Sequence, residues 1–409
     1  MEEHDAVIVG ARCAGATLAT ALAQRGWDVL MLDRDRMPSD TISTHLIYPN
    51  TLARLEEIGA LDRLLSEHTL ALAPHRLRGL GHELTGTFSP VGGHDRLAAP
   101  RRRVLDKAIV DTALAEGAQG SFGNRVVELV GSGSEEDPVR GVVMDDGRRI
   151  GARWVFGADG RGSVVASRLG LEKQRPQRGE VAFSYSYWKG IAADGYATLH
   201  INRDEMLYHG PVEDGLYILI VTGQPELAKG SKPERERSYM EAIRRFPETF
   251  EPALLDAAEM LTEVTVAPES LMRGFYRTAA GPGWALVGDA GHFKHPGTAQ
   301  GIGDAVEQAL HVAEALSGPR PTLEGYEHWR DQRSAEHYDW SFDWGRFPKP
   351  ETGEPVFRGM AGEPDAGQNL RDCLARQIEP SQLMSKERLA RWFAAPPPAP
   401  EPAEEPAAG

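Results

Sequence analysis

The sequence predicts an α/β fold into which a second, mostly antiparallel β-sheet is inserted. Three observations predict it. Residues 7–32 read as strand, helix and strand in close succession. From residue 181 the apolar side chains recur with a period of two, which is typical of a half-exposed strand. Residues 284–316 then return to a buried strand followed by a helix, so the first domain resumes after the insertion.

The first strand–helix–strand unit is predicted from its residue types and from the glycine that ends its helix. Val7–Val9 is a β-branched run, which indicates a buried parallel strand. Residues 14–25 are rich in Ala and Leu and end at Gly26, as a helix does. Residues 29–32 form the second strand, and residues 103–115 predict another helix. The parallel part of the fold therefore begins near the first residue.

The inserted part is predicted from alternation and turns. Before the insertion, within residues 98–180, residues 139–150 read as a hairpin around Asp146-Gly147. Phe183, Tyr185 and Tyr187 alternate with small or polar residues. We expect a discontinuous nucleotide-binding domain in residues 1–75, 98–180 and 270–345, and a substrate domain in residues 76–97 and 181–269. A helical or irregular segment would cover residues 346–393, followed by a disordered tail at 394–409.

Composition narrows the partners. The 409 residues carry a net charge of -15, which disfavours nucleic acid and anionic membranes. Two cysteines suit a reducing compartment and make neither a disulfide framework nor a metal site. No signal peptide and no apolar run of about 20 residues is evident. We expect a cytoplasmic monomer or homodimer without a bound metal.

A glycine turn joins the first strand to the first helix. Residues 10–15 read Gly-Ala-Arg-Cys-Ala-Gly, close to the dinucleotide fingerprint, with Arg12 in place of the middle glycine. The helix end attracts a pyrophosphate, and the Arg12 guanidinium must point away or join that contact. Asp33 ends the second strand, and a carboxylate at this position is suited to accept a hydrogen bond from a ribose hydroxyl. The turn predicts dinucleotide contacts but leaves NAD and FAD open; the residues expected to make them are Gly10, Arg12, Ala14, Gly15, Asp33 and Arg34.

Two further motifs favour a flavin. Residues 157–163 (Gly-Ala-Asp-Gly-Arg-Gly-Ser) follow the strand at Trp154. Residues 288–292 (Gly-Asp-Ala-Gly-His) follow the strand at Trp284, and residues 296–302 lead into a helix. Asp289 is suited to a ribityl hydroxyl. The helix N-terminus, with Gly301 and Ile302, is suited to the pyrimidine edge of the ring, where reduced flavin is negative.

Together the three motifs resemble the class A flavoprotein monooxygenases, the family of para-hydroxybenzoate hydroxylase, over roughly residues 1–345. The resemblance implies a Rossmann-like FAD/NAD(P)-binding fold in which Asp159, Arg102 and Val126 also bind the cofactor. Arg12 and the segment Ser39–His45 are most similar to a bacterial subgroup, in which that segment passes near the isoalloxazine ring. The implied activity is hydroxylation of an aromatic or polyketide-like molecule through a flavin C4a-hydroperoxide, with NAD(P)H as transient co-substrate and O₂.

Residues for catalysis and substrate binding follow only from chain position. We expect His45 as catalytic base, and Tyr185, Tyr187 and His209 as substrate contacts. The alternative activity is reduction of a C=C bond, as in geranylgeranyl reductases, which share this fold. A halogenase is disfavoured because the first lysine is Lys107 and no Trp-x-Trp-x-x-Pro segment is present. A flavoprotein that only senses or carries a ligand remains a further alternative.

Overall fold

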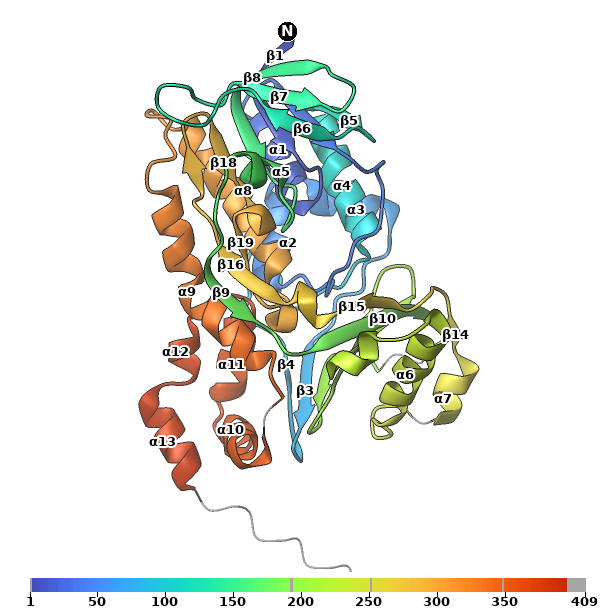
Figure 1. The fold of residues 1–409 in the computed structure, drawn as a ribbon. Helices are drawn as coiled ribbons and strands as arrows, with labels where there is room; N and C mark the ends of the chain where they lie inside the picture. Colours follow the sequence, from blue (N-terminus) through green and yellow to red (C-terminus); the bar gives the residue numbers. More distant parts are fainter. Residues whose placement is uncertain (1, 192–193, 251, 348, 396–409) are drawn as a thin grey trace, which may run out of the picture.

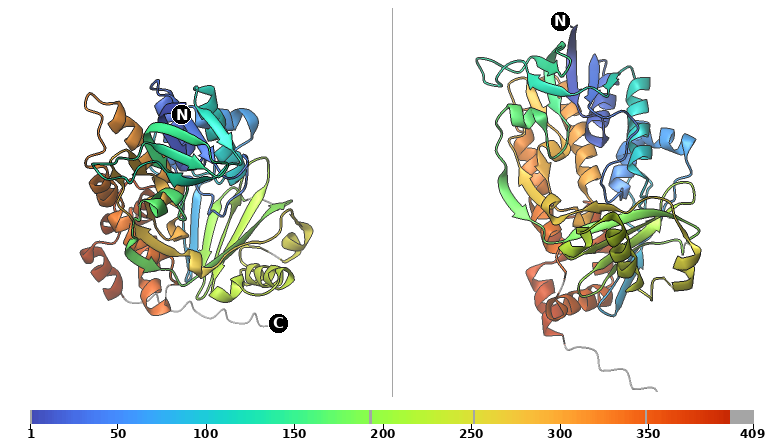
Figure 2. Two further views of the ribbon diagram at one scale, coloured as in Figure 1. Left: turned by 45° about the horizontal axis from the view of Figure 1, so that its top comes forward. Right: turned by 45° about the vertical axis from the view of Figure 1, so that its right-hand side comes forward.

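The computed structural model describes residues 2–191, 194–250, 252–347 and 349–395. Figure 1 shows three regions: a nucleotide-binding-type domain at the top, a second sheet at the lower right, and a group of C-terminal helices at the lower left. The N-terminus lies at the outer end of the first region, as Figure 1 and the right view of Figure 2 show. No helix in the described part of the chain is long and apolar enough to cross a membrane.

A parallel sheet forms the centre of the first domain. Its strands are β1 (Glu2–Val9), β2 (Val29–Asp33), β5 (Gln119–Phe122), β8 (Arg149–Gly157) and β18 (Trp284–Leu286), with the short β17 (Ala280–Gly281) at the edge. The order β17-β18-β8-β1-β2-β5 places β1 between strands that are distant in sequence. The pairs Val7↔Leu30 and Val7↔Val155 fix the register of β1 on both sides. The three motifs therefore meet at the carboxyl ends of β1, β8 and β18.

The two faces of this sheet are covered differently. Helices α1 (Cys13–Ala23), α2 (Pro49–Glu57), α3 (Ala60–Glu67), α4 (Arg102–Ala115) and α8 (Gly301–Ser317) pack on one face in one apolar cluster. The antiparallel strands β6 (Val126–Leu129) and β7 (Gly141–Met144) and the short helix α5 (Val164–Arg168) cover the other. The predicted helices at 14–25, 103–115 and 302–316 and the hairpin at 139–150 are present, with ends shifted by a few residues at most in the helices.

The second sheet is mostly antiparallel, as predicted. It runs β14 (Glu259–Met260), β10 (Ala182–Lys189), β13 (Tyr217–Gly223), β12 (Met206–Pro211), β11 (Ala197–Ile201), β3 (His75–Gly79) and β4 (His82–Gly86), and β15 (Thr265–Ala267) also pairs with β10. One pair, β11 with β3, is parallel. Helices α6 (Lys232–Arg244) and α7 (Pro252–Ala257) lie over one face. The other face turns toward the first domain and the C-terminal helices.

Short elements connect the two domains. A third sheet pairs β9 (Gln174–Arg178) with β16 (Arg273–Tyr276) and β16 with β19 (His292–Phe293). Helix α9 (Tyr326–Trp344) packs on this sheet through Tyr338 and Phe342, which cluster with Tyr276. One-turn 3-10 helices lie at Pro225–Ala228, Glu269–Leu271, Gly288–Ala290 and Pro296–Thr298. The chain therefore crosses between the domains beside the third motif.

The segment after residue 345 is more regular than its Pro- and Gly-rich sequence suggests. It forms α10 (Pro350–Gly362), α11 (Ala366–Leu374), α12 (Pro380–Leu383) and α13 (Lys386–Ala394). Its apolar side chains join the core of the second sheet, where Leu370, Leu374 and Trp392 are buried. Tertiary packing stabilises helices that local propensity alone does not predict. Most of the tail expected to be disordered, from residue 396, lies outside the described residues.

Candidate dinucleotide-binding and active site

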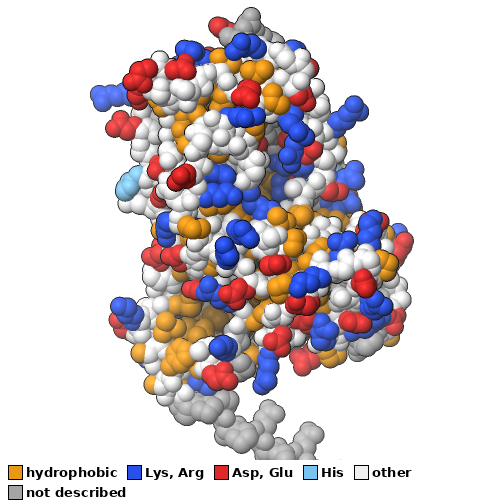
Figure 3. Space-filling model, viewed as in Figure 1, with side chains coloured by type: hydrophobic (Ala, Val, Ile, Leu, Met, Phe, Trp, Pro, Cys, Tyr) orange, Lys and Arg blue, Asp and Glu red, His pale blue; other side chains and the backbone are white. Residues whose placement is uncertain are grey.

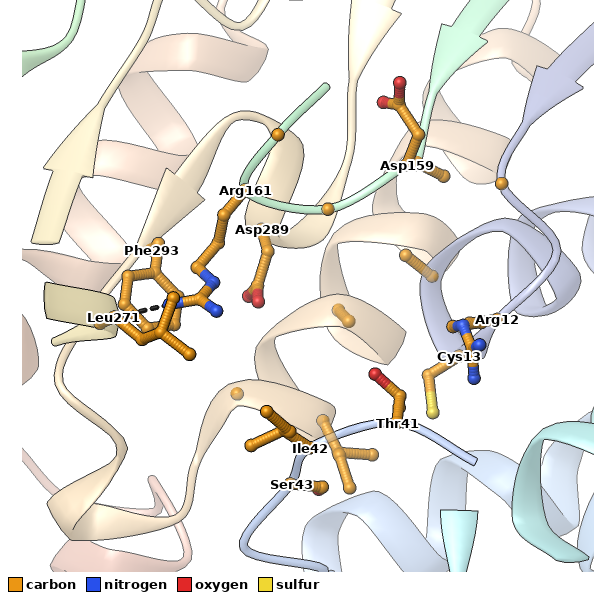
Figure 4. Close-up of a pocket in the computed structure, with 18 of the residues that line it drawn as sticks. Arg12, Cys13, Thr41, Ile42, Ser43, Asp159, Arg161, Leu271, Asp289 and Phe293 are labelled. Atoms are coloured by element: carbon orange, nitrogen blue, oxygen red, sulfur yellow. Dashed lines mark hydrogen bonds between the residues drawn. The ribbon is translucent and has the colours of Figure 1, made fainter. Parts of the chain in front are cut away.

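A cavity of about 780 Å³ lies where the three motifs meet, between the first domain and the second sheet. Figure 4 shows its residues arriving from β1, β8 and β18 on the motif side, and from the loop at Thr41–Ser43 on the opposite side. In Figure 3 the face shown is hollowed between the upper part and the lower right lobe, with Lys and Arg side chains at its edge. The cavity is therefore bounded by both domains.

The glycines of the first turn are required by close backbone approach. Gly10 has a φ of 102°, and a Cβ there would stand 2.4 Å from the Ala158 carbonyl oxygen. A Cβ at Gly15 would stand 1.8 Å from the Gly10 carbonyl oxygen. Gly10 lines the cavity, whereas Gly15 lies behind it. The second glycine thus acts by packing α1 against the turn, as the fingerprint predicts.

Asp33 ends β2 beside this turn. One carboxylate oxygen accepts a hydrogen bond from the Ala11 N–H at 2.8 Å, and the other accepts from the Asp35 N–H at 2.9 Å. The side chain is buried on the protein side but lines the cavity. Each oxygen retains a further lone pair, so Asp33 is held in position to accept from a hydroxyl group in the cavity.

A buried carboxylate holds the two arginines of the site. Asp106 on α4 is fully buried and accepts from Arg12 at 3.2 Å and from Arg102 at 3.0 Å. The Cys13 thiol donates to the same carboxylate at 2.9 Å, and burial raises the pKa of this thiol. Burial opposes the charge of Arg102, but Asp106 outweighs it and raises the pKa of the guanidinium above its usual range. Two permanent cations therefore line the cavity beside the N-terminus of α1.

The second motif offers an unpaired acceptor. Asp159 accepts from the Val164 N–H at 2.6 Å through one oxygen, while its buried Oδ1 has no hydrogen-bond partner within the chain. Burial raises the pKa of Asp159 despite bonds that favour its ionised form. Buried polar atoms are rarely left unpaired in folded proteins. In Figure 4 the Asp159 carboxylate points away from the centre of the cavity, so this residue lines the cavity with its other atoms.

Asp289 of the third motif points into the centre of the cavity in Figure 4. Burial raises its pKa to about 6, although Arg161 and Arg102 lower it. The Arg161 guanidinium lies beside it, donates to the Leu271 carbonyl, and stacks over the Phe293 ring at 4.7 Å. A carboxylate in this position can accept from a hydroxyl chain that runs through the cavity.

The N-terminus of α8 closes the inner end of the cavity. Its N-cap is Gln300, and Gly301 and Ile302 line the cavity wall. Lys294 and Asp304 line the same wall and form an ion pair at 2.7 Å. A ring at this end would face the positive pole of a 17-residue helix and a buried lysine.

His45, Tyr185 and Tyr187, which were predicted for catalysis or substrate binding, lie together but do not line the cavity. The Tyr187 hydroxyl and His45 Nε2 are 2.6 Å apart, and the His45 ring packs edge-on against Tyr185 at 5.1 Å. His45 is fully buried, and burial lowers its pKa to about 3. None of the three lines the cavity; Thr41 and Ser43, from the loop just before His45, do. They therefore support that loop.

His209 does not join them. In β12, His209 lies on the same face as Leu207, against α6 and α7, where its ring packs on Phe250 at 4.7 Å. Tyr208, its neighbour, belongs to the face that turns toward the cavity side. The expectation that His209 contacts substrate in this cavity is corrected by the strand's period of two, which sends it to the far face.

The expected cofactor residues converge, with one exception. All except Gly15 line the one cavity: Gly10, Arg12, Ala14, Asp33, Arg34, Arg102, Val126, Asp159, Asp289, Gly301 and Ile302. The sequence interpretation missed Asp106 and Lys294. Asp106 could have been found as a carboxylate four residues after Arg102 on a helix. Lys294 carries no local signal, because its partner and its burial come from tertiary structure.

Comparison with known proteins agrees with this geometry. The family model described as "FAD binding domain" matches residues 3–341. Menaquinone reductase of Mycolicibacterium smegmatis is 26% identical over 320 residues, covering 76% of each chain. The 2-heptyl-3-hydroxy-4(1H)-quinolone synthase of Mycobacteroides abscessus is 26% identical, covering 80% of this chain and 86% of the relative. The crystal structure of a flavoprotein/dehydrogenase from Cytophaga hutchinsonii superimposes with a TM-score of 0.78 at 18% identity, covering 96% and 99% of the two chains.

The residues present fit FAD. Arg12 and Arg102 line the cavity beside the start of α1, the carboxylate of Asp289 points into it, and a helix N-terminus closes its inner end. The matched residues, 3–341, run from β1 into α9 and include the inserted sheet. The chain accordingly belongs to the FAD binding domain family and is a flavin-dependent oxidoreductase.

Proposed function

We propose that this chain is a monooxygenase that uses NAD(P)H and O₂ to hydroxylate a compact aromatic or polyketide-like molecule. One observation carries the proposal. The cavity that holds the dinucleotide motifs continues, without a dividing wall, to Phe183 on β10, to Ala267 on β15 and to Met272. A substrate bound against these residues would lie next to the flavin end of the cofactor site.

The size of the substrate follows from the C-terminal helices. They fill much of the cavity-side face of the second sheet, where Phe88, Phe357 and Trp392 belong to one buried cluster. No described residue beyond Ala305 lines the cavity. A short space bounded by a polar loop favours a planar ring system over a long isoprenoid chain.

Bound FAD would supply the transfer of electrons from NAD(P)H and the activation of O₂. The chain's own groups bind and orient. Asp289 and Asp33 accept from hydroxyl groups, Arg12 and Arg102 neutralise phosphate, and the start of α8 opposes negative charge at the ring edge. With a pKa of about 3, His45 is a weak base at neutral pH. We therefore assign it to positioning the loop at Thr41–Ser43 through Tyr187.

A second candidate function is reduction of a quinone or of a C=C bond. The relative named menaquinone reductase favours it, because it matches three quarters of this chain. The relative named as a 3-hydroxyquinolone synthase, which matches a similar share, fits the hydroxylase instead. A fold does not determine which reaction is catalysed. The two functions are distinguished by whether an oxygen atom from O₂ enters the product.

The deciding experiment measures whether an oxygen atom from O₂ is incorporated into the product. Purified protein with its flavin is given NADH or NADPH, ¹⁸O₂, and a panel of phenols, quinolones and quinones. A hydroxylase shows substrate-accelerated NAD(P)H oxidation and one ¹⁸O atom in the product. Product that forms equally well without O₂, with a double bond or quinone reduced and no ¹⁸O incorporated, overturns the proposal.

A paired set of variants locates the substrate. Phe183→Leu shortens a side chain in the cavity wall and should change KM and the fraction of NAD(P)H oxidation coupled to product, with FAD content retained. Ser184→Ala is the matched control, because Ser184 is the next residue of β10 and points to the opposite face. Equal effects of both changes would place the substrate elsewhere.

A further inference from the structure

Lys294 is a buried lysine in the wall of the cavity. It follows β19, and only 3% of its side chain is exposed. Its Nζ donates to Gln300 Oε1 at 2.8 Å and forms an ion pair with Asp304 Oδ2 at 2.7 Å. Both partners belong to the first turn of α8 or its N-cap. The ammonium group is therefore fixed at the helix end that faces the cavity.

The C-terminal segment holds this arrangement from behind. Gln300 Nε2 donates to the carbonyls of Cys373 and Leu374, each at 3.0 Å, so its oxygen is turned toward Lys294. Arg376 is buried and pairs with the other oxygen of Asp304. Asp304 is thus shared between two cations, and Arg376 also lies 3.7 Å from a second carboxylate, that of Glu307.

The charges persist at neutral pH. Burial lowers the pKa of Lys294 to about 8, although Asp304 opposes the shift. Burial alone would raise the pKa of Asp304, but Arg376 and Lys294 outweigh it and hold that pKa below its usual range. A buried ion pair is weak evidence of stabilisation, since desolvation offsets much of the attraction. The buried Lys294 is therefore better explained by an interaction with the ligand of the cavity than by a contribution to folding stability.

We propose that Lys294 supplies the positive charge that favours reduced FAD, and that Asp304, Gln300 and Arg376 position it. The inference rests on the proposed placement of the ring at the start of α8. Reduced flavin carries negative charge at its pyrimidine edge, and a fixed cation in a partly dry site stabilises such charge more than water does. The N-cap itself is a neutral amide, so Lys294 brings the full charge to this wall.

The test is the midpoint potential of the bound FAD, measured by anaerobic reductive titration at pH 7. In Lys294→Gln, reduced FAD should be favoured at least tenfold less over oxidised FAD, a fall of about 30 mV for a two-electron couple. Lys294→Arg should stay near the wild type. Asp304→Asn should shift the potential upward, because it removes the negative partner and leaves the cations. Opposite signs separate a charge effect from damage to the fold.

Lys173→Gln is the matched control. Lys173 lines the same cavity but is exposed at its rim beside Phe275. A shift as large as that of Lys294→Gln, or no shift in Lys294→Gln, overturns the inference. If Lys294→Gln retains no flavin, the Asp304→Asn result decides: a raised potential supports the inference and a lowered one overturns it. This readout needs no substrate, so it stands or falls separately from the proposed hydroxylation.

Discussion

Replacing Asp106 by alanine should destabilise the protein without its cofactor more than the protein with it. Asp106 is fully buried and is the shared carboxylate of Arg12 and Arg102. Removing one partner of a buried ion pair costs about 3–5 kcal/mol, because the remaining charge is left unpaired. Here that charge is Arg102, since Arg12 keeps its ion pair with Asp35 at 3.2 Å. For 409 residues at roughly 2.1 cal/mol/K each, that free energy corresponds to a fall in melting temperature of about 3–6 °C.

The cofactor should recover part of this loss. Both arginines line the cavity, so a bound pyrophosphate would replace the missing carboxylate as their counter-charge. We expect the fall in melting temperature with saturating FAD to be smaller than the fall without it. The assay is thermal unfolding of matched samples with and without FAD, followed by circular dichroism.

Asp111→Ala is the control on the same helix. Asp111 pairs with Lys107 at 2.6 Å in a partly exposed position, where an ion pair contributes about 0–1 kcal/mol. The reasoning is refuted if Asp106→Ala costs no more than Asp111→Ala. Equal losses with and without FAD would instead refute the placement of the pyrophosphate between the two arginines.

Three further predictions concern packing, pH and the support of the loop. Gly15→Ala should abolish FAD binding, because its Cβ meets backbone at 1.8 Å, whereas Gly162→Ala meets nothing within 4 Å and should retain FAD by absorbance at 450 nm. Burial raises the pKa of Asp289 to about 6, so the cofactor-free protein should lose up to about 3 kcal/mol of stability as pH rises from about 4 to 6. Chemical unfolding across that range should show the loss in the wild type and not in Asp289→Asn. Tyr187→Phe should cost about 1–3 kcal/mol, because it leaves the buried His45 Nε2 without a partner; an unchanged melting temperature contradicts this.

The nucleotide-binding half was predictable from sequence because its signals are local. Each of these site residues ends or closely follows a strand that can be predicted from its own residue types. This holds for the turn at Gly10 and for Asp33, Asp159 and Asp289. Parallel strands present their carboxyl ends at one edge, so such residues meet without any knowledge of the side chains between them. Their shared cavity is the consequence.

The sheet domain was predicted in type but not in orientation. Alternation identified β10 and β12, yet it does not say which face turns to the cofactor. His209 lies on the face of β12 that turns away from the cavity, and His45, Tyr185 and Tyr187 pack together without lining it. His45 meets Tyr185 and Tyr187 of β10 only because the loop before Tyr48 folds over the sheet.

The sequence by itself determined the dinucleotide cradle, since glycine turns, strand ends and helix starts are specified by neighbouring residues. Only the tertiary structure decided the charges around it. Asp106 joins Arg12 to Arg102, and Arg376 reaches Asp304 from 72 residues along the chain. Such pairs form because burial forces each charge to find a partner in space, and a linear pattern does not record which distant residue provides it.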